Sequence, residues 1–141
     1  MTPRVFVDTS AFIALAYSDD EHHVDAQVIA QALERQRARL YTTNFVIAET
    51  HALMLRRLGH VQARHFLRQV DAGQVAAVVR ATIGDEEAAK ALIYRYTDKE
   101  YSLTDAISFT MMTRLRLKTA FAFDKHFGQY GWQILEPNRD K

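Results

Sequence analysis

The chain has 141 residues, 48% of them hydrophobic and 25% charged, which is typical of one compact domain over residues 1–141. Eighteen lysine and arginine residues balance seventeen aspartate and glutamate residues, and the formal net charge of +1 excludes a global field that draws the chain to nucleic acid or membrane. Cysteine is absent, which excludes disulfides and thiolate catalysis.

Apolar runs and helical periodicity alternate along the chain. The short run at 4–7 ends at Asp8, as expected for a buried parallel strand. Asn44 is placed to cap a long apolar helix, and Gly59 stands in its C-terminal capping position. The expected elements in chain order are strand 4–7, helix 11–17, helix 26–36, strand 40–43, helix 44–58, helix 60–71, strand 75–79, helix 85–96, helix 102–115, strand 120–123 and strand 133–135.

This alternation predicts an α/β fold of three layers, α/β/α, with a central parallel sheet. The sequence has no repeats and only two prolines, both near the ends, so we expect no internal linker. The longest uncharged stretch, residues 9–18, is about half of a membrane span, and the N-terminus has no signal-peptide pattern. We therefore expect a cytoplasmic protein without membrane contact.

Four acidic residues lie within or beside apolar segments. Asp8 and Asp124 each follow an expected strand, Glu49 shares a helix face with core-type residues such as Leu53, and Asp105 lies at a helix start. Ligands of parallel sheets bind beyond the carboxyl ends of the strands, so the four carboxylates can meet there. Crowded or buried carboxylates need a compensating cation, and the pattern therefore predicts a metal site.

Each acid also has a purely structural interpretation. Asp105 can complete a helix capping box with Ser102, and Asp8 or Asp124 can end a strand and begin a turn. Glu49 can belong to a solvated stripe on a half-exposed helix. The sequence taken residue by residue leaves both interpretations open.

Four short segments together resemble the acidic motifs of PIN-domain ribonucleases. They are VDTSA at 7–11, IAET at 47–50, LTDA at 103–106 and FAFD at 121–124, and their order and spacing also match over essentially the whole chain. Small bacterial and archaeal proteins of this kind are most often VapC-type toxins of toxin–antitoxin pairs. The resemblance implies a PIN-like fold and a metal-dependent endoribonuclease whose metal-binding and catalytic acids are Asp8, Glu49, Asp105 and Asp124. The hydroxyl positions that flank such acids are Thr9, Ser10 and Thr104.

The same resemblance implies partners: an RNA substrate, a cognate antitoxin protein and a second copy of the chain in a homodimer. Two other functions stay open for a PIN-like chain. One is a housekeeping nuclease of RNA processing, and the other is a module that binds RNA or protein without cutting.

The residue types favour Mg²⁺ or Mn²⁺ as the cofactor, since oxygen ligands predominate and no cysteine or His-Glu-x-x-His segment accompanies them. Such an ion orients a phosphodiester and lowers the pKa of a bound water. We interpret the six histidines mostly as surface residues, with His22 and His126 as candidates for touching substrate.

Arginine clusters at 35–39, 56–68 and 114–118 can contact phosphates, although charged runs on helices are more often solvated faces. The phenylalanines are expected to fill the core and to form no base-stacking platform; they are Phe6, Phe12, Phe45, Phe109, Phe121 and Phe123.

Other phosphate chemistries lack their residues. A haloacid-dehalogenase-type enzyme needs a second acid at Ser10, and a receiver-type domain needs an acid after the third strand, where Arg80 and Thr82 stand. No Gly-x-Gly-x-x-Gly segment follows a strand, which excludes this dinucleotide-binding motif.

Overall fold

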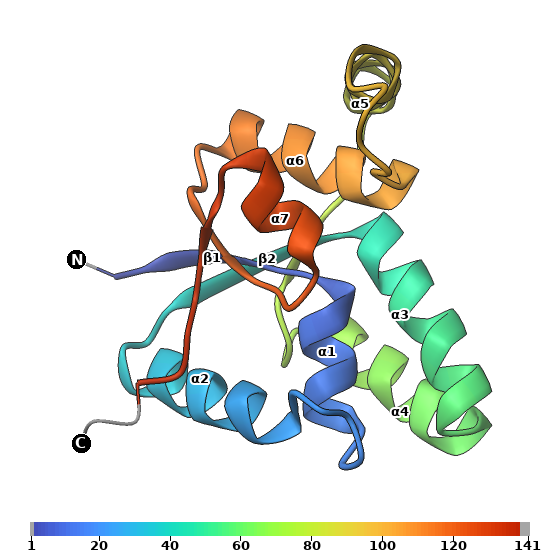
Figure 1. The fold of residues 1–141 in the computed structure, drawn as a ribbon. Coiled ribbons are helices and arrows are strands. Elements are labelled where there is room, and N and C mark those ends of the chain that lie inside the picture. The colour runs from blue at the N-terminus through green and yellow to red at the C-terminus, as the bar shows by residue number, and fades with distance from the viewer. Residues whose placement is uncertain (1, 139–141) are drawn as a thin grey trace.

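A computed structural model describes residues 2–138 as a five-stranded sheet with helices on both faces (Figure 1). Every strand pair is parallel, and the strand order is β3-β2-β1-β4-β5. The expected α/β/α fold with a central parallel sheet is confirmed. In chain order the elements are β1 Arg4–Val7, α1 Thr9–Ala16, α2 His23–Arg35, β2 Arg39–Thr43, α3 Asn44–Arg57, α4 His60–Asp71, β3 Ala77–Val79, α5 Ile83–Arg95, α6 Leu103–Leu115, β4 Thr119–Phe121, α7 Lys125–Tyr130 and β5 Gln133–Ile134.

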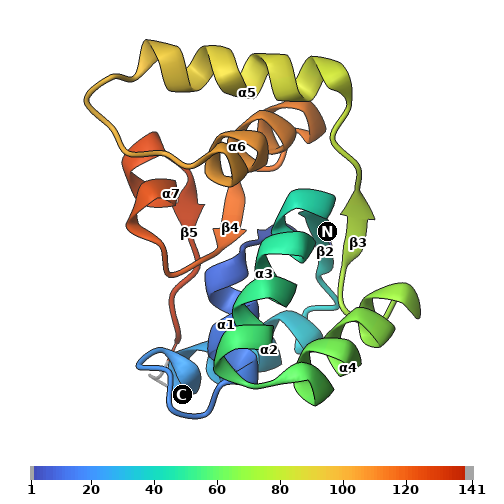
Figure 2. The ribbon, with the colours of Figure 1, turned by 90° about the vertical axis from the view of Figure 1, so that its right-hand side faces the viewer.

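The helices form two unequal layers. Helices α1, α2 and α4 lie on one side of the sheet, and α6 and α7 lie on the other (Figure 1). Helix α5 lies outside α6 and packs mainly against it, while α3 runs from the end of β2 past α1 to α4 (Figure 2). No helix within residues 2–138 is long and apolar enough to cross a membrane.

Strand β1 is buried on both faces because helices cover both faces of the sheet. Phe6 is fully buried, and its ring stacks on Phe127 of α7 with a centroid distance of 6.2 Å. Val7, the next residue, points to the opposite face, where Phe12 of α1 and Leu33 of α2 lie. Burial of each such side chain contributes about 1.5–3 kcal/mol, which explains why residues 5–7 form an unbroken apolar run after the exposed Arg4.

The chain order reverses at β1. After β1 the chain adds β2 and β3 on one side, and β4 and β5 follow on the other, so β1 and β4 flank the switch point of the sheet. The backbone N–H of Asp8 donates to the carbonyl of Phe121 at 3.1 Å and joins the ends of these two strands. The segments that carry Asp8 and Asp124 are therefore neighbours at the carboxyl edge of the sheet.

Two local expectations differ from the structure. Thr43, not Asn44, caps α3: its hydroxyl accepts from the N–H of Val46 at 3.1 Å. The amide oxygen of Asn44 instead accepts from the N–H of Ala81 at 2.9 Å and ties α3 to the segment after β3. Both residue types suit a cap, and the extended backbone of Thr43 at the end of β2 decides between them.

Gly59 ends α3 as expected, with a φ of 91° and its N–H donating to the carbonyl of Met54 at 3.1 Å. Helix α7 was not expected. Its six residues lie between a cap at Asp124 and Gly131, which has a φ of 114°, and so short a helix leaves little periodicity in the sequence.

Candidate metal centre at the carboxyl edge of the sheet

Asp8 caps α1 and is held by a neighbouring hydroxyl. Its Oδ2 accepts from the backbone N–H of Ser10 at 3.1 Å and from Ser10 Oγ at 2.6 Å, and the residue is 3% exposed. Ser10 Oγ in turn accepts from the N–H of Phe123 at 2.9 Å. Ser10 therefore fixes the carboxylate of Asp8 against the segment that leads to Asp124.

Asp105 and Asp124 also lie at helix N-termini. Asp105 completes a capping box with Ser102: its Oδ2 accepts from the Ser102 N–H at 3.2 Å, and its own N–H donates to Ser102 Oγ at 3.0 Å. Asp124 caps α7, and its Oδ1 accepts from the N–H of His126 at 2.8 Å. The capping box expected at Asp105 is thus present, and Asp8 and Asp124, expected to end strands and begin turns, each cap the helix that follows.

Capping does not exclude ligand binding, because each cap uses one carboxylate oxygen. Within residues 2–138, no hydrogen bond reaches Oδ1 of Asp8, Oδ1 of Asp105 or Oδ2 of Asp124. The helix N-terminus favours the ionised form of each cap. The local structure therefore fixes each side chain and leaves one oxygen of each available.

Glu49 of α3 completes the group from another direction. It is half-buried and lines a hollow of about 390 Å³ together with Asp8, Asp124 and Ser10. Asp105 does not line this hollow, but its carboxylate, that of Asp124 and His126 each offer a ligand atom, and the three atoms lie within 4.8 Å of one another. The four acids predicted from sequence are therefore gathered around Asp124.

The electrostatics of this group are unfavourable without a cation. The pKa of Asp8 is raised to about 7, chiefly by burial; the charges of Asp105 and Asp124 contribute to this rise, and the hydrogen bonds from Ser10 oppose it. Burial also raises the pKa of Asp105, with Asp124 adding to the shift and Ser102 and His126 opposing it. Within the described residues no lysine or arginine forms an ion pair with any of the four acids.

His126 is a functional candidate that lies inside the group. Its Nδ1 is 2.9 Å from Asp124 Oδ1 and 3.1 Å from Asp105 Oδ2. The nitrogen is buried and neither contact has hydrogen-bond alignment. Its side chain is 19% exposed, so His126 differs from a surface histidine, and it stays the candidate for touching substrate that the sequence offered. The oxygen-rich donor set with one imidazole fits a divalent metal ion.

The three flanking hydroxyls differ in their contacts. Ser10 bonds directly to Asp8. Thr9 Oγ1 accepts from Thr50 Oγ1 at 3.2 Å and joins α1 to α3. The side chain of Thr104 makes no hydrogen bond within residues 2–138. Only Ser10 therefore acts on a carboxylate directly.

The hollow has further lining residues: Asp20, Arg57 and the earlier candidate His22, which lie outside the motifs, and Phe123, which lies inside one. The sequence spacing could have predicted Arg57, since Glu49, Leu53 and Arg57 follow one another at four-residue intervals and therefore lie on one face of α3. No comparable periodic signal identifies Phe123 as a lining residue, because its apolar run is also typical of core. It is partly buried against the core, as expected, and it also lines this hollow and stacks on His22.

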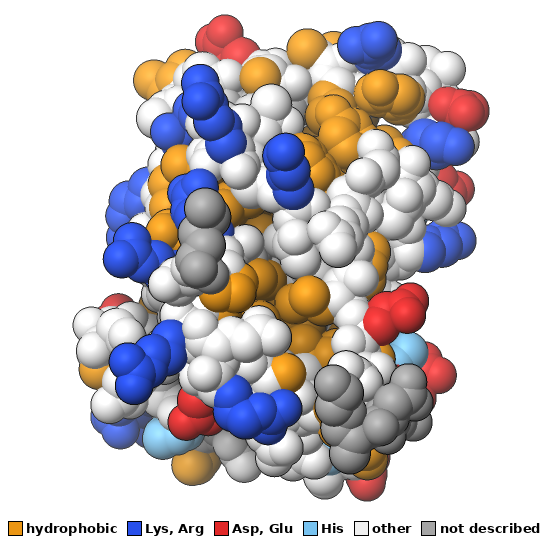
Figure 3. Space-filling view, turned by 90° about the vertical axis from the view of Figure 1, so that its left-hand side faces the viewer, with side chains coloured by type: hydrophobic (Ala, Val, Ile, Leu, Met, Phe, Trp, Pro, Cys, Tyr) orange, Lys and Arg blue, Asp and Glu red, His pale blue; other side chains and the backbone are white. Residues whose placement is uncertain are grey.

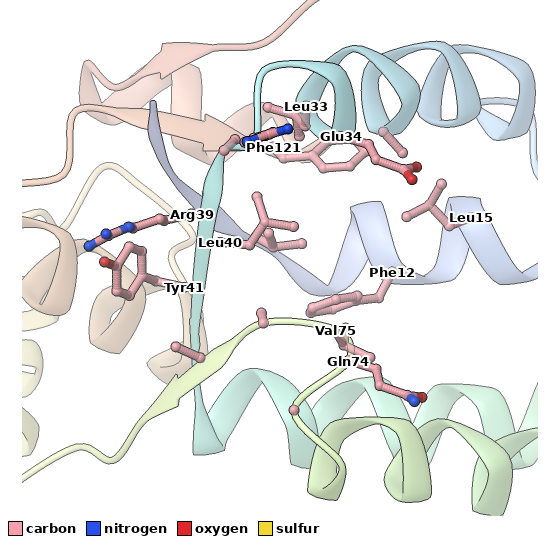
Figure 4. Close-up of a pocket in the computed structure, with 17 residues that line it drawn as sticks. Phe12, Leu15, Leu33, Glu34, Arg39, Leu40, Tyr41, Gln74, Val75 and Phe121 are labelled. Atoms are coloured by element: carbon pink, nitrogen blue, oxygen red, sulfur yellow. The ribbon is translucent and has the colours of Figure 1, made fainter. Parts of the chain in front are cut away.

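A larger hollow of about 820 Å³ lies elsewhere and contains none of the four acids. Its lining is mainly apolar, with Phe12, Leu33, Leu40 and Phe121 pointing into it from α1, α2, β2 and β4 (Figure 4). The face of the molecule on which β1 begins shows hydrophobic side chains among scattered lysines and arginines (Figure 3). Size alone therefore does not identify the reactive site.

Comparisons with known proteins agree with this geometry. The PIN domain family model matches residues 5–133. The chain is 32% identical over 133 residues to the Mycobacterium tuberculosis protein named 23S rRNA-specific endonuclease VapC20, covering 94% of this chain and 98% of the relative. The chain is also 28% identical over 142 residues to a VapC ribonuclease of Archaeoglobus fulgidus, and this match covers 96% of the chain and 89% of that relative.

Solved structures show the same fold. The crystal structure of Mycobacterium tuberculosis VapC20, described as a sarcin–ricin loop cleaving toxin, matches with a TM-score of 0.87 at 32% identity and covers 94% of this chain and 99% of that one. The crystal structure of FitAcB from Neisseria gonorrhoeae matches with a TM-score of 0.66 at 14% identity and covers 94% of this chain and 97% of that one. This second match shows a similarity of fold alone.

Proposed function

The chain belongs to the PIN-domain family, among its VapC ribonucleases, and we propose that it is a metal-dependent endoribonuclease that acts as the toxin of a toxin–antitoxin pair. One observation carries the proposal. Asp8, Asp105 and Asp124 are held close together by their caps, each with one oxygen free of hydrogen bonds and without a lysine or arginine as partner. Such a group is stable in its ionised form only with a bound cation.

In the proposed site Asp8, Glu49, Asp105 and Asp124 hold the ion, and Mg²⁺ or Mn²⁺ suits their oxygen atoms. When bound, the ion supplies charge neutralisation at the phosphodiester and a water of lowered pKa. Ser10 keeps Asp8 oriented through two hydrogen bonds. His126 lies against Asp105 and Asp124 and limits how far their carboxylates can turn.

The proposed substrate is RNA, and the names of the VapC20 relative suggest the sarcin–ricin loop of 23S rRNA as the first RNA to test. The proposed protein partner is an antitoxin that brings a basic side chain to the acids, because a guanidinium pairs with two carboxylate oxygens and competes with a metal. We also propose a homodimer, for which the exposed Ile83 and Tyr94 of α5 offer apolar surface.

Replacement of Asp8 tests the function. Asp8→Asn keeps the shape of the side chain and removes the charge, so we expect cleavage of a sarcin–ricin loop RNA and of total RNA in Mg²⁺ or Mn²⁺ to fall by at least about 100-fold, the upper range for losing a supporting group around a metal. Asp71→Asn, at an exposed residue, is the matched control. Equal cleavage by parent and Asp8→Asn would refute the assignment.

The RNA cleavage assay, with measurements of growth and copurification, separates the other functions. A non-cleaving module would leave both RNAs intact in the parent, in either metal. A housekeeping nuclease would cut RNA but would neither arrest growth when expressed alone nor copurify with the protein encoded beside it.

A further inference from the structure

The hollow at the acids continues beyond them along α3. Glu49, Leu53 and Arg57 stand on one side of that helix at intervals of four residues, so the wall changes from acidic to apolar to basic over about 12 Å of helix axis. Ile13 of α1 lines the same hollow. The acids occupy one end of this space, and the other end lies outside the proposed metal centre.

A pair of stacked rings forms another part of the lining. The imidazole of His22 and the ring of Phe123 are 4.5 Å apart between centroids and 5° from parallel. Hydrogen bonds fix the backbone of both residues: the N–H of His22 donates to Asp20 Oδ1 at 2.8 Å, and the N–H of Phe123 donates to Ser10 Oγ at 2.9 Å. The side chain of His22 is 39% exposed, so the pair is fixed and still accessible to a ligand.

Arg57 supplies the positive charge of this hollow. It is the one arginine or lysine among the described lining residues. Within residues 2–138 its guanidinium makes no ion pair and no hydrogen bond, although Glu49 and Asp20 line the same space. An arginine that is unpaired beside carboxylates is available to an anion brought by the substrate.

We propose that this part of the hollow is a subsite for one unpaired nucleotide of the RNA, next to the bond that is cut. The nucleobase stacks on the His22–Phe123 ring pair, Ile13 and Leu53 supply apolar lining, and Arg57 binds a phosphate. This inference rests on the proposed nuclease function. Stacking on aromatic rings with a nearby arginine is the general mode by which proteins hold single-stranded bases.

The size of the hollow supports a single nucleotide. About 390 Å³ lies at the small end of the range for pockets that enclose a small molecule. A base inside a duplex has both faces covered by its neighbours and cannot stack on the ring pair unless it is extruded. The subsite therefore selects loops, bulges or extruded bases over continuous helices.

Arginine variants test the phosphate contact. Arg57→Ala should lower kcat/KM about 10-fold on any RNA that the parent cleaves, and should make the plot of log kcat/KM against log salt shallower by about 0.7, the slope of one phosphate contact in single strands. Arg56→Ala, the exposed neighbour on α3 that does not line the hollow, is the control and should change neither. Equal salt slopes for the Arg57 and Arg56 variants would overturn this half of the proposal.

Ring variants test the base contact. His22→Ala should lower kcat/KM about 5- to 30-fold, within the range seen for base stacking on aromatic side chains, and His22→Phe should restore it because the flat ring returns without the imidazole. In a series of RNAs with one abasic ribose each, one position should weaken cleavage by the parent and cause no further loss in His22→Ala. Equal activity of parent, His22→Ala and every abasic RNA would overturn the base contact.

The two proposals fail in different ways. If the parent cuts RNA and the subsite variants match it, the nuclease stands and the subsite is wrong. If the parent cuts nothing, the nuclease proposal fails, and fluorescence anisotropy with a labelled single-stranded RNA then decides the subsite. Equal dissociation constants for parent, His22→Ala and Arg57→Ala would refute it, and weaker binding by both variants would support it.

Discussion

Asp85 and Asp105 have the same local structure and opposite electrostatics. Both are the third residue of a helix and complete a capping box, with Thr82 in α5 and Ser102 in α6. Asp85 receives two hydrogen bonds of 2.9 Å from the guanidinium of Arg114. Burial alone would raise the pKa of Asp85, but the bonds from Arg114 and Thr82 outweigh it and the pKa is lowered.

Asp105 meets a second carboxylate where Asp85 meets a guanidinium. Burial raises its pKa and the charge of Asp124 adds to the rise. The two aspartates show that a capping motif alone does not reveal a metal site. Asp105 differs from Asp85 because, within the described residues, no lysine or arginine pairs with it. Whether a capping aspartate has such a partner is decided by the tertiary structure.

The pH dependence of stability gives the largest expected effect. For Asp8 the pKa rises from 3.8 in the unfolded chain to about 7 in the folded one, so the folded state binds the proton more tightly. Metal-free stability should therefore fall as the pH rises from about 4 to 7, by up to about 4 kcal/mol at about 1.4 kcal/mol per pKa unit. Urea unfolding in EDTA at a series of pH values measures this.

The control is Asp8→Asn, which should flatten the fall because the amide does not titrate. The contribution of Asp85 to the pH dependence has the opposite sign. Because the folded pKa of Asp85 is lower than its unfolded pKa of 3.8, the ionised side chain stabilises the fold at pH values above 3.8, and this stability is lost as the pH falls through the folded pKa. A parent protein that gains stability steadily from pH 4 to 7 without metal would contradict the contrast.

Charge removal at the two capping aspartates sharpens the comparison. Asp85→Asn breaks a buried bidentate pair and should destabilise the fold by about 2 kcal/mol, below the range for fully buried pairs because the side chain of Arg114 is 45% exposed. Urea midpoints in EDTA give this value, and a loss under about 0.5 kcal/mol would show that the pair contributes little.

Asp105→Asn should have a smaller effect of the other sign. It removes the repulsion from Asp124 and the cost of burying the charge, so metal-free stability should rise by about 1 kcal/mol at pH 8. The same urea series measures it. If Asp105→Asn and Asp85→Asn both destabilise the metal-free fold equally, the proposed difference between the two regions is wrong.

Much of the fold could be predicted from the sequence, since buried parallel strands leave apolar runs and the long helices leave clear ends. The elements missed were short or ambiguous: α7 is six residues long, and Thr43 and Asn44 are both suitable caps. The four acids could be selected because their spacing resembles a known family, whereas composition alone left them open to capping.

The tertiary partners could not be predicted. Asp85 is, from the sequence, only the first residue of the expected helix 85–96, yet it pairs with Arg114, 29 residues away. His126 was expected only as a candidate for touching substrate and Phe123 only as a core residue, yet His126 lies against two of the acids and Phe123 also lines the hollow. Such contacts depend on how α5, α6 and α7 pack, and no local pattern records that packing.

The central claim is that the carboxyl edge of the sheet needs a divalent cation, and thermal melting with Mn²⁺ or Mg²⁺ tests it most directly. At pH 8 and a concentration about 100 times the dissociation constant, metal should stabilise the fold by about 2.7 kcal/mol, which raises Tm by about 5–10 °C. The rise should shrink at pH 5, where Asp8 is protonated, and should vanish in Asp8→Asn but persist in Asp71→Asn. An unchanged Tm with both ions at pH 8, or an equal rise in Asp8→Asn, would contradict the account.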